Sequence, residues 1–498
     1  MILLFALLPI DIIAKCFADY LDVDDVSALD IACCSTLDRP AFLDAIHWRH
    51  AVFKGITFQS SSDSYFIWLI SRNVSVLELA FDKSSFSFKT FELLIDKRIF
   101  SHTINLTIDG YSFTEDILLL ISDLFPSLQK LHLESISSQT SSAALTSILQ
   151  TTNTTLTDLI IRSCSDGLLD SSFSRALTKC IKLQRLELSS LSYDLNTPSG
   201  QLNFITIIES CSGLPLQYLN IRLNDDLVNN QVIKNIAHNL HSLITLDMSH
   251  NSFGDNGVVL LQRVLPYLES LSLDKCDISG TSWTHMTQRC KNLSHLSLLK
   301  CDGLLSSTFL STPTNSFPSL TSLNLTGISS LTDSAVIHLS NCFKSLKRFE
   351  IGGRGSLISD KGVKGVVRKC SDRLELLSIE RCELVTDMSI LTIATCCPNL
   401  ETLYCDNCSI FDFSSFELLG EGCTLLKQLS IGGQEWIDSH SIDKLTTFFP
   451  RLEKLVIDTE ANDDLLTNGS SIIQVGKKKG IKIFIFLSAQ AGYTVFVE

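Results

Sequence analysis

The sequence predicts an α/β solenoid, a horseshoe in which about 16 parallel strands line the concave side and helices lie outside. An apolar frame of the form L-x-x-L-x-L recurs along most of the 498 residues. Each frame alternates apolar and polar residues, as a strand does, and a segment with helical spacing follows it. A chain of this length would ordinarily divide into several domains, whereas a stack of repeats grows without that limit.

The repeat is defined by the central apolar residue of each frame. These residues are Leu77, Leu106, Leu131, Leu159, Leu186, Leu219, Leu246, Leu271, Leu296, Leu323, Phe349, Leu377, Leu403, Leu429, Leu455 and Ile483. The fifteen steps between them average about 27 residues, a regularity that indicates internal repetition. The longest step, from Leu186 to Leu219, contains Pro198 and Gly200 and therefore indicates a loop insertion.

Each unit is expected to contain a strand, a turn and a helix, in that order. The stretch LETLYCD (400–406) has the alternation of a strand, and TDSAVIHLSNC (332–342) has apolar residues at helical spacing. Ser, Thr or Gly followed by Asp, as in ISDKGV, predicts a capped helix start with a carboxylate near its positive end. Proline in FPSL or CPNL ends the helix before the next strand. Strands joined by helices lie parallel, so about 16 of them give a concave arc of roughly 75 Å.

Of the 17 cysteines, three (Cys16, Cys33 and Cys34) belong to the N-terminal segment, and the others fall within the repeats. Five of them, Cys164, Cys276, Cys301, Cys382 and Cys408, lie five residues after a central leucine, where other units carry Asn224 or Asn251. We expect this side chain to hydrogen-bond the backbone of the adjoining coil. Seven more are expected at helix ends as small buried groups: Cys180, Cys211, Cys290, Cys342, Cys370, Cys397 and Cys423.

One cysteine pair has the spacing of a metal or redox motif, C-x-x-C at Cys405 and Cys408. Strand alternation gives its two members different structural roles, and no second pair lies at ligand spacing. The sequence therefore predicts no metal and no cofactor. Many unpaired thiols are typical of a reducing compartment, so we expect a cytoplasmic or nuclear protein.

Charge and hydropathy exclude other partner classes. A formal net charge of −14 argues against general binding to nucleic acid or an anionic membrane. The apolar start, MILLFALLPIDII, lacks the basic region and cleavage site of a signal peptide. No window approaches the roughly 20 apolar residues of a spanning helix. We expect neither nucleic acid nor membrane as a partner.

Units such as CELVTDMSILTIATCCPNLETLYCDNC (382–408) resemble the cysteine-containing class of leucine-rich repeats, which is typical of F-box proteins of the SCF ubiquitin ligases. Residues 8–34, LPIDIIAKCFADYLDVDDVSALDIACC, resemble an F-box, although CCSTLDRPAF follows where that family usually carries a tryptophan. The resemblance implies a leucine-rich-repeat solenoid whose N-terminal segment binds a Skp-type adaptor and, through it, the cullin ligase core. It places these residues at or beneath the adaptor contact: Leu8, Pro9, Ile12, Ile13, Phe17, Leu21, Val26 and Leu29.

The expected domains are an F-box-like helical domain (1–50), a helical linker or N-terminal cap (51–73), the repeats (74–460) and a C-terminal capping repeat (461–498). From the residues alone, the N-terminal segment is an amphipathic helical hairpin. It either binds the adaptor or seals the first repeat, as the ends of solenoids require.

The binding face is predicted by position, because side chains beside the central leucines point to the concave side. The residues expected to contact a protein substrate are Arg162, Arg185, Glu187, Tyr218, Arg222, Asp247, Asp274, Arg348, Glu380, Tyr404 and Asp406. The two tyrosines are the expected anchors, since aromatic residues dominate interface energetics. A phosphorylated segment would need clustered basic residues, which only Arg162, Arg185 and Arg222 offer.

The catalytic constellations in the sequence are weak. The glycine run IGGRG (351–355) is not followed by the G-K-[ST] of a phosphate loop, and the histidines show no H-E-x-x-H spacing. The expected function is therefore substrate recognition for a ubiquitin ligase, without enzyme activity. The alternatives are a non-catalytic scaffold or inhibitor with no link to ubiquitin, and an enzyme regulator similar to the Ran GTPase-activating proteins.

Overall fold

The computed structural model describes residues 52–58, 75–81, 100–110, 115–136, 142–164, 168–191, 199–409, 411–434, 436–459, 472–489 and 492–497. The F-box-like segment lies outside the described residues, and so do all eight residues predicted to contact the adaptor. The chain forms two compact units, Met1–Leu243 and Ile244–Glu498, and the described residues of each form a stack of strand–turn–helix repeats.

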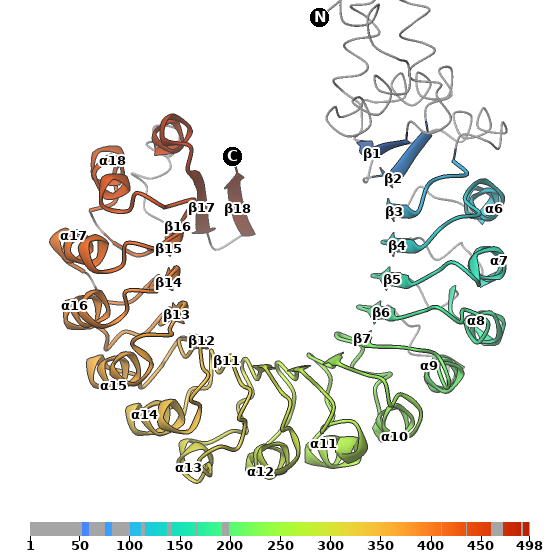
Figure 1. The fold of residues 1–498 in the computed structure, drawn as a ribbon, viewed down its shortest axis with the longest axis horizontal. Coiled ribbons are helices and arrows are strands. Elements are labelled where there is room, and N and C mark those ends of the chain that lie inside the picture. The colour runs from blue at the N-terminus through green and yellow to red at the C-terminus, as the bar shows by residue number, and fades with distance from the viewer. Residues whose placement is uncertain are drawn as a thin grey trace, which may run out of the picture. The chain divides into compact units, whose positions relative to one another are not determined.

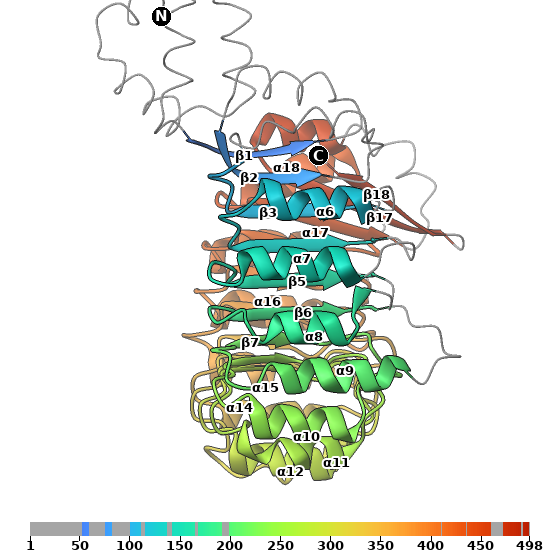
Figure 2. The same ribbon diagram turned by 90° about the vertical axis from the view of Figure 1, so that its right-hand side faces the viewer.

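The first unit contains a parallel sheet with helices on one face (Figure 1). Its strands pair in chain order: β1 (Val52–Phe58), β2 (Ser75–Phe81), β3 (Asn105–Asp109), β4 (Lys130–Glu134), β5 (Asp158–Arg162), β6 (Arg185–Ser189) and β7 (Tyr218–Asn220). Its helices are α6 (Glu115–Leu124), α7 (Ser142–Thr152), α8 (Ser171–Leu177), α9 (Ser199–Ser210) and α10 (Asn230–Asn239). Seen from the side, these helices follow one another in parallel rows (Figure 2).

The second unit repeats the arrangement. Its strands are β8 (Thr245–Asp247), β9 (Ser270–Ser272), β10 (His295–Ser297), β11 (Ser322–Asn324), β12 (Arg348–Glu350), β13 (Leu376–Ser378), β14 (Thr402–Tyr404), β15 (Gln428–Ser430), β16 (Lys454–Thr459), β17 (Lys482–Ala489) and β18 (Gly492–Val497). Neighbours from β8 to β17 are parallel, and β18 is antiparallel to β17. The helices are α11 (Asp255–Leu260), α12 (Gly280–Arg289), α13 (Ser306–Leu310), α14 (Asp333–Cys342), α15 (Asp360–Cys370), α16 (Asp387–Cys396), α17 (Phe413–Gly422), α18 (Ser439–Phe448) and a helix at 472–479.

Strand register confirms the predicted leucine-rich-repeat fold. In the first unit the central leucines from Leu106 to Leu219 stand opposite one another across successive strands, and in the second unit the same row runs from Leu246 to Ile483. These side chains are at most 2 % exposed. Burying them requires stacking, because a single strand–helix pair has no second surface to cover its leucines.

Two sequence predictions near the first repeat are wrong. The central residue of β2 is Leu79, which pairs with Leu106, and not Leu77. The segment predicted as a helical linker (51–73) contains β1, whose VFKGITF sequence pairs in parallel with β2. Its β-branched and aromatic residues favour a strand, but the segment lacks the leucine frame by which the repeats were counted.

A sharp turn follows each strand from β3 to β15 and directs the next side chain, a cysteine or asparagine in several units, into the coil. The residue four positions after the central leucine has a positive φ, for example 51° at Ser163 and 52° at Lys275. The next side chain then reaches the preceding unit: Cys301 Sγ donates to the Leu273 carbonyl at 3.0 Å, and Asn224 Nδ2 to that of Leu188 at 2.6 Å. The hydrogen bond to the adjoining coil is thereby confirmed for Cys301 and Asn224, whereas Cys382 donates instead to the Ser356 hydroxyl.

Aspartates at the first position of several helices link neighbouring repeats in the second unit. The backbone N–H of Ser359 donates to Asp333 Oδ1 at 2.8 Å, and that of Thr386 donates to Asp360 Oδ1 at 2.9 Å. The Ser389 hydroxyl also donates to Asp360. The predicted carboxylate near the helix start is therefore present, and it additionally binds the next unit. Among the described residues, no helix has the length and apolar character needed to cross a membrane.

Candidate protein-binding faces

The candidate site is the face of each sheet that the helices leave open. Strand alternation directs the residues on either side of each central leucine to this face, while the leucine itself points into the core. All eleven residues predicted to contact a substrate lie on or at the end of these strands. Five belong to the first unit, and six, from Asp247 to Asp406, belong to the second.

A buried carboxylate organises the open face of the first unit. Glu187 on β6 is only 1 % exposed. It accepts a hydrogen bond from Arg162 Nε at 2.5 Å and another from the Ser189 hydroxyl at 3.2 Å. Arg185 Nη2 lies 3.6 Å from its second oxygen, and the Arg185 guanidinium stacks 3.6 Å above the Tyr218 ring.

These contacts hold the cluster in its charged form. Burial alone would raise the pKa of Glu187, but the hydrogen bond and charge of Arg162 outweigh it and leave that pKa below its ordinary value. The same hydrogen bond raises the pKa of Arg162. The structure therefore brings together four of the five predicted residues of this unit.

The three arginines expected to bind a phosphorylated segment form a less positive cluster than the sequence indicated. Glu187 compensates charge on Arg162 and Arg185, because it lies between them. Arg222 is exposed and lies beyond β7, three residues after Leu219. The three arginines consequently carry less net positive charge than their number implies.

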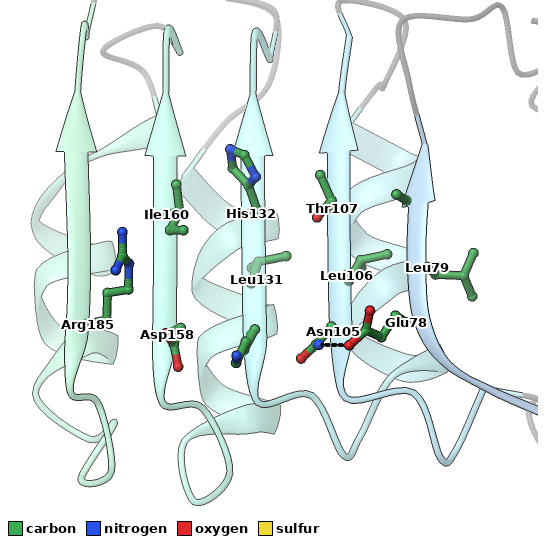
Figure 3. A pocket seen from close by; sticks show the side chains of 12 residues that line it. Glu78, Leu79, Asn105, Leu106, Thr107, Leu131, His132, Asp158, Ile160 and Arg185 are labelled. Carbon is green, nitrogen blue, oxygen red and sulfur yellow. Dashed lines mark hydrogen bonds between the residues drawn. The ribbon is translucent and has the colours of Figure 1, made fainter. Parts of the chain in front are cut away.

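A hollow of about 490 Å³ lies beside this cluster, across β2 to β6 (Figure 3). Of the predicted substrate-contacting residues, only Arg185 lines it; the other lining residues include Asn105, Lys130, His132 and Asp158. They occupy face positions that the repeat defines. Nothing in the repeat pattern, however, distinguished this stretch of the face from any other.

The open face of the second unit also carries carboxylates. Asp274 Oδ1 accepts hydrogen bonds from the Ser297 hydroxyl at 2.5 Å and the Leu299 N–H at 2.8 Å. Burial raises the pKa of Asp274 nevertheless, and the charge of Asp247 adds to that rise. The predicted pair Asp247 and Asp274 therefore repel each other on one face.

Tyr404 lies among charged residues on another part of this face. Its side chain is half-buried, and its hydroxyl donates to Gln428 Oε1 at 3.3 Å. Burial raises its pKa, and the charges of Glu350, Glu380 and Asp406 raise it further, against the effect of Arg348. The structure thus places four predicted residues of this unit close together, around an aromatic ring.

Most thiols of the described residues are buried. The two members of the C-x-x-C motif have separate roles, because Cys405 Sγ donates to the Ser430 carbonyl and Cys408 Sγ to that of Ile379. Burial raises the pKa of Cys164 to about 11, which keeps that thiol protonated at neutral pH. No group of three His, Cys, Asp or Glu side chains that would hold a metal occurs in the described ranges.

Comparison with known proteins supports the resemblance drawn from the repeats. No protein-family model matches the chain. Over 163 residues it is 27 % identical to F-box/LRR-repeat protein 4 of Bos taurus, a match that spans 32 % of this chain and 26 % of that protein. This similarity confirms the resemblance to F-box/leucine-rich-repeat proteins, over about a quarter of the relative's length.

Two solved structures are similar over most of the chain. The Rad7–Elc1 complex in yeast matches with a TM-score of 0.47 and 16 % identity, over 82 % of this chain and 84 % of that one. The TLR13–ssRNA13 complex matches with a TM-score of 0.43 and 16 % identity, over 89 % of this chain and 63 % of that one. Neither score is high enough to bear on function.

Proposed function

We propose that this protein is the substrate-recognition subunit of an SCF-type ubiquitin ligase. The N-terminal segment would bind a Skp-type adaptor, which connects it to the cullin core, and the open sheet faces would bind the target protein. Ubiquitin transfer would be carried out by other subunits, so the chain would have no active site of its own. The buried thiols suit a reducing compartment, the cytoplasm or nucleus.

The observation that carries this proposal is the preorganised cluster around Glu187. Arg162, Arg185 and Tyr218 are held by ionic and stacking contacts, yet each remains partly exposed on the open face. Side chains already fixed in place lose little conformational freedom on binding, and Tyr and Arg are the residues most often found in interface hot spots. Such a face suits recognition of a protein, and the sequence similarity to an F-box/LRR-repeat protein supports the ligase role.

A pull-down with the Skp adaptor tests the ligase role. Wild-type protein should be retained, and the double variant Ile13→Asp, Phe17→Asp should be lost, because both changes put a charge on the apolar face predicted to contact the adaptor. The variant Tyr404→Asp, on the repeat face, should be retained like wild type and serves as the matched control. No retention of the folded wild type would refute the ligase role and leave a scaffold that binds protein by the same faces.

A further inference from the structure

The hollow on the first unit arises from the size of neighbouring side chains. Ala80 and Thr107 follow the central leucines of β2 and β3, and both are small. The row that follows the central leucines is therefore low at these two strands, whereas Glu78 and Asn105, which precede the same leucines, have longer side chains (Figure 3). The helices lie behind the sheet in this view, and the hollow therefore opens away from them.

One wall of the hollow has an ordered pattern of charge. The residue before the central leucine is Glu78 on β2, Asn105 on β3, Lys130 on β4, Asp158 on β5 and Arg185 on β6. These residues stand directly opposite one another in the strand register. Along the wall the order is negative, neutral, positive, negative, positive.

The other wall does not disturb this pattern. It contains Thr107, His132 and Ile160, two of which are uncharged at any pH. Burial lowers the pKa of His132, and the neighbouring Arg162 lowers it further, so the imidazole is neutral near pH 7. The charge that a ligand meets in the hollow is consequently set by the first wall.

We propose that this hollow binds an extended segment of the partner protein, laid across the strands. Its side chains would be cationic opposite Glu78, anionic opposite Lys130, cationic opposite Asp158 and anionic opposite Arg185. This inference rests on the protein-binding function proposed above. It specifies which part of the open face is used and which charges the partner segment carries. Alternating carboxylates disfavour a nucleic acid, whose phosphates are uniformly negative.

The spacing of the wall fits an extended chain. Five strands about 4.8 Å apart span roughly 19 Å, which about seven extended residues cover at 3.3 Å each. Lys130 lies two strands from Glu78, or about 10 Å, the length of three extended residues. Asp158 and Arg185 follow at about 5 Å each. A peptide of sequence KSAEKSE spans the wall with its four charges about 10, 3 and 7 Å apart along the chain, and the long, flexible Lys and Glu side chains make up the differences of about 2 Å.

Fluorescence anisotropy with the full-length protein tests the proposal. The first probe is fluorescein-labelled KSAEKSE with blocked termini, and the second is KSAKESE, which has the same composition but exchanges the inner charges. The wild type should bind the first probe about tenfold more tightly, because the second places like charges opposite Lys130 and Asp158. The double variant Lys130→Glu, Asp158→Lys conserves net charge and should reverse this preference.

A filling substitution tests whether the hollow itself is used. Thr107→Trp should occupy the hollow and reduce binding of KSAEKSE at least tenfold. Ser272→Trp, at the matching position on β9 in the second unit, should leave binding unchanged. Circular dichroism confirms folding of each variant, and the charge exchange remains informative if Thr107→Trp does not fold.

Equal affinity of the wild type for the two peptides, or no reversal in the double variant, would overturn the proposal. Binding that Thr107→Trp leaves intact would overturn it as well. Adaptor retention is measured separately and depends on Ile13 and Phe17. A negative peptide result with normal adaptor retention therefore refutes the hollow as the binding site and leaves the proposed function standing.

Discussion

Asn224 should be one of the most sensitive polar positions in the chain, because it connects two repeats inside the core. It is 2 % exposed. Its Nδ2 donates to the carbonyls of Leu188 at 2.6 Å and Ile221 at 3.0 Å, and its Oδ1 accepts from the N–H of Leu191 at 3.0 Å. Asn224→Ala leaves three backbone groups without this partner. At about 1 to 3 kcal/mol for each buried unsatisfied group, partly relieved by relaxation, we expect a loss of about 3 to 5 kcal/mol.

Other repeats indicate which substitution is tolerated best at this position. Cys301 occupies the same place in its unit and donates one hydrogen bond, to Leu273. Asn224→Cys should therefore keep one of the three hydrogen bonds and lose about 2 to 3 kcal/mol, which is less than alanine. Asn230→Ala, on an exposed helix position nearby, should change stability by no more than about 0.5 kcal/mol.

Urea denaturation measures the order of stability of these three variants. Hydrogen exchange at the Leu191 amide reports the local effect, since a stack of repeats need not unfold in one step. If Asn224→Ala unfolds at the same urea concentration as wild type and leaves that amide equally protected, the hydrogen bonds do not hold the repeats together and this reasoning is refuted.

The structure predicts the direction in which three further substitutions change the stability of the protein. Gly353→Ala should destabilise the protein by about 3 kcal/mol or more, because its φ is 135° and a Cβ would lie 2.6 Å from the Gly327 backbone. Gly355→Ala, with open space around it, should cost only about 1 kcal/mol, and equal urea midpoints for the two would contradict this. Asp360→Asn should cost about 1 kcal/mol at pH 7. Burial alone would raise the pKa of Asp360, but hydrogen bonds from the next repeat lower it overall. The stability that the Asp360 carboxylate contributes is therefore present above about pH 4 and disappears as the pH falls through the folded-state pKa. A stability difference between Asp360→Asn and wild type that persists at pH 2 would show that the charged carboxylate is not its source. Arg162→Met should lose about 2 to 4 kcal/mol, because Glu187 stays buried with only the more distant Arg185 to compensate it. A thermal melt unchanged by this variant would show that the cluster is not preorganised.

The repeat register could be predicted from sequence because it depends on local pattern. A leucine stands at the centre of most strands, and an asparagine or cysteine follows it five residues later in seven units. Both positions face the interior of the coil. The same method failed at the first repeats, where β1 has strand-forming residues without the leucine frame and where Leu77 and Leu79 both fit the alternation. Only pairing with Leu106 decides between them.

The candidate site could be predicted in outline but not in detail. Its residues lie on the expected face because strand alternation fixes the direction of each side chain. Which of them act together depends on neighbours about 27 residues away in sequence, as with Arg162 and Glu187, which are 25 apart. The hollow depends on the size of Ala80 and Thr107 relative to the residues beside them. Neither property is encoded within one repeat.

Site-specific photo-crosslinking in cells tests most directly whether the open sheet faces bind a protein. A benzoylphenylalanine replaces Tyr218 on the first unit, Tyr404 on the second, or Tyr267, which precedes β9 and is 60 % exposed. If the open faces bind a protein, discrete crosslinked proteins should form at Tyr218 or Tyr404 and none at Tyr267. Crosslinks at Tyr267 alone would contradict it.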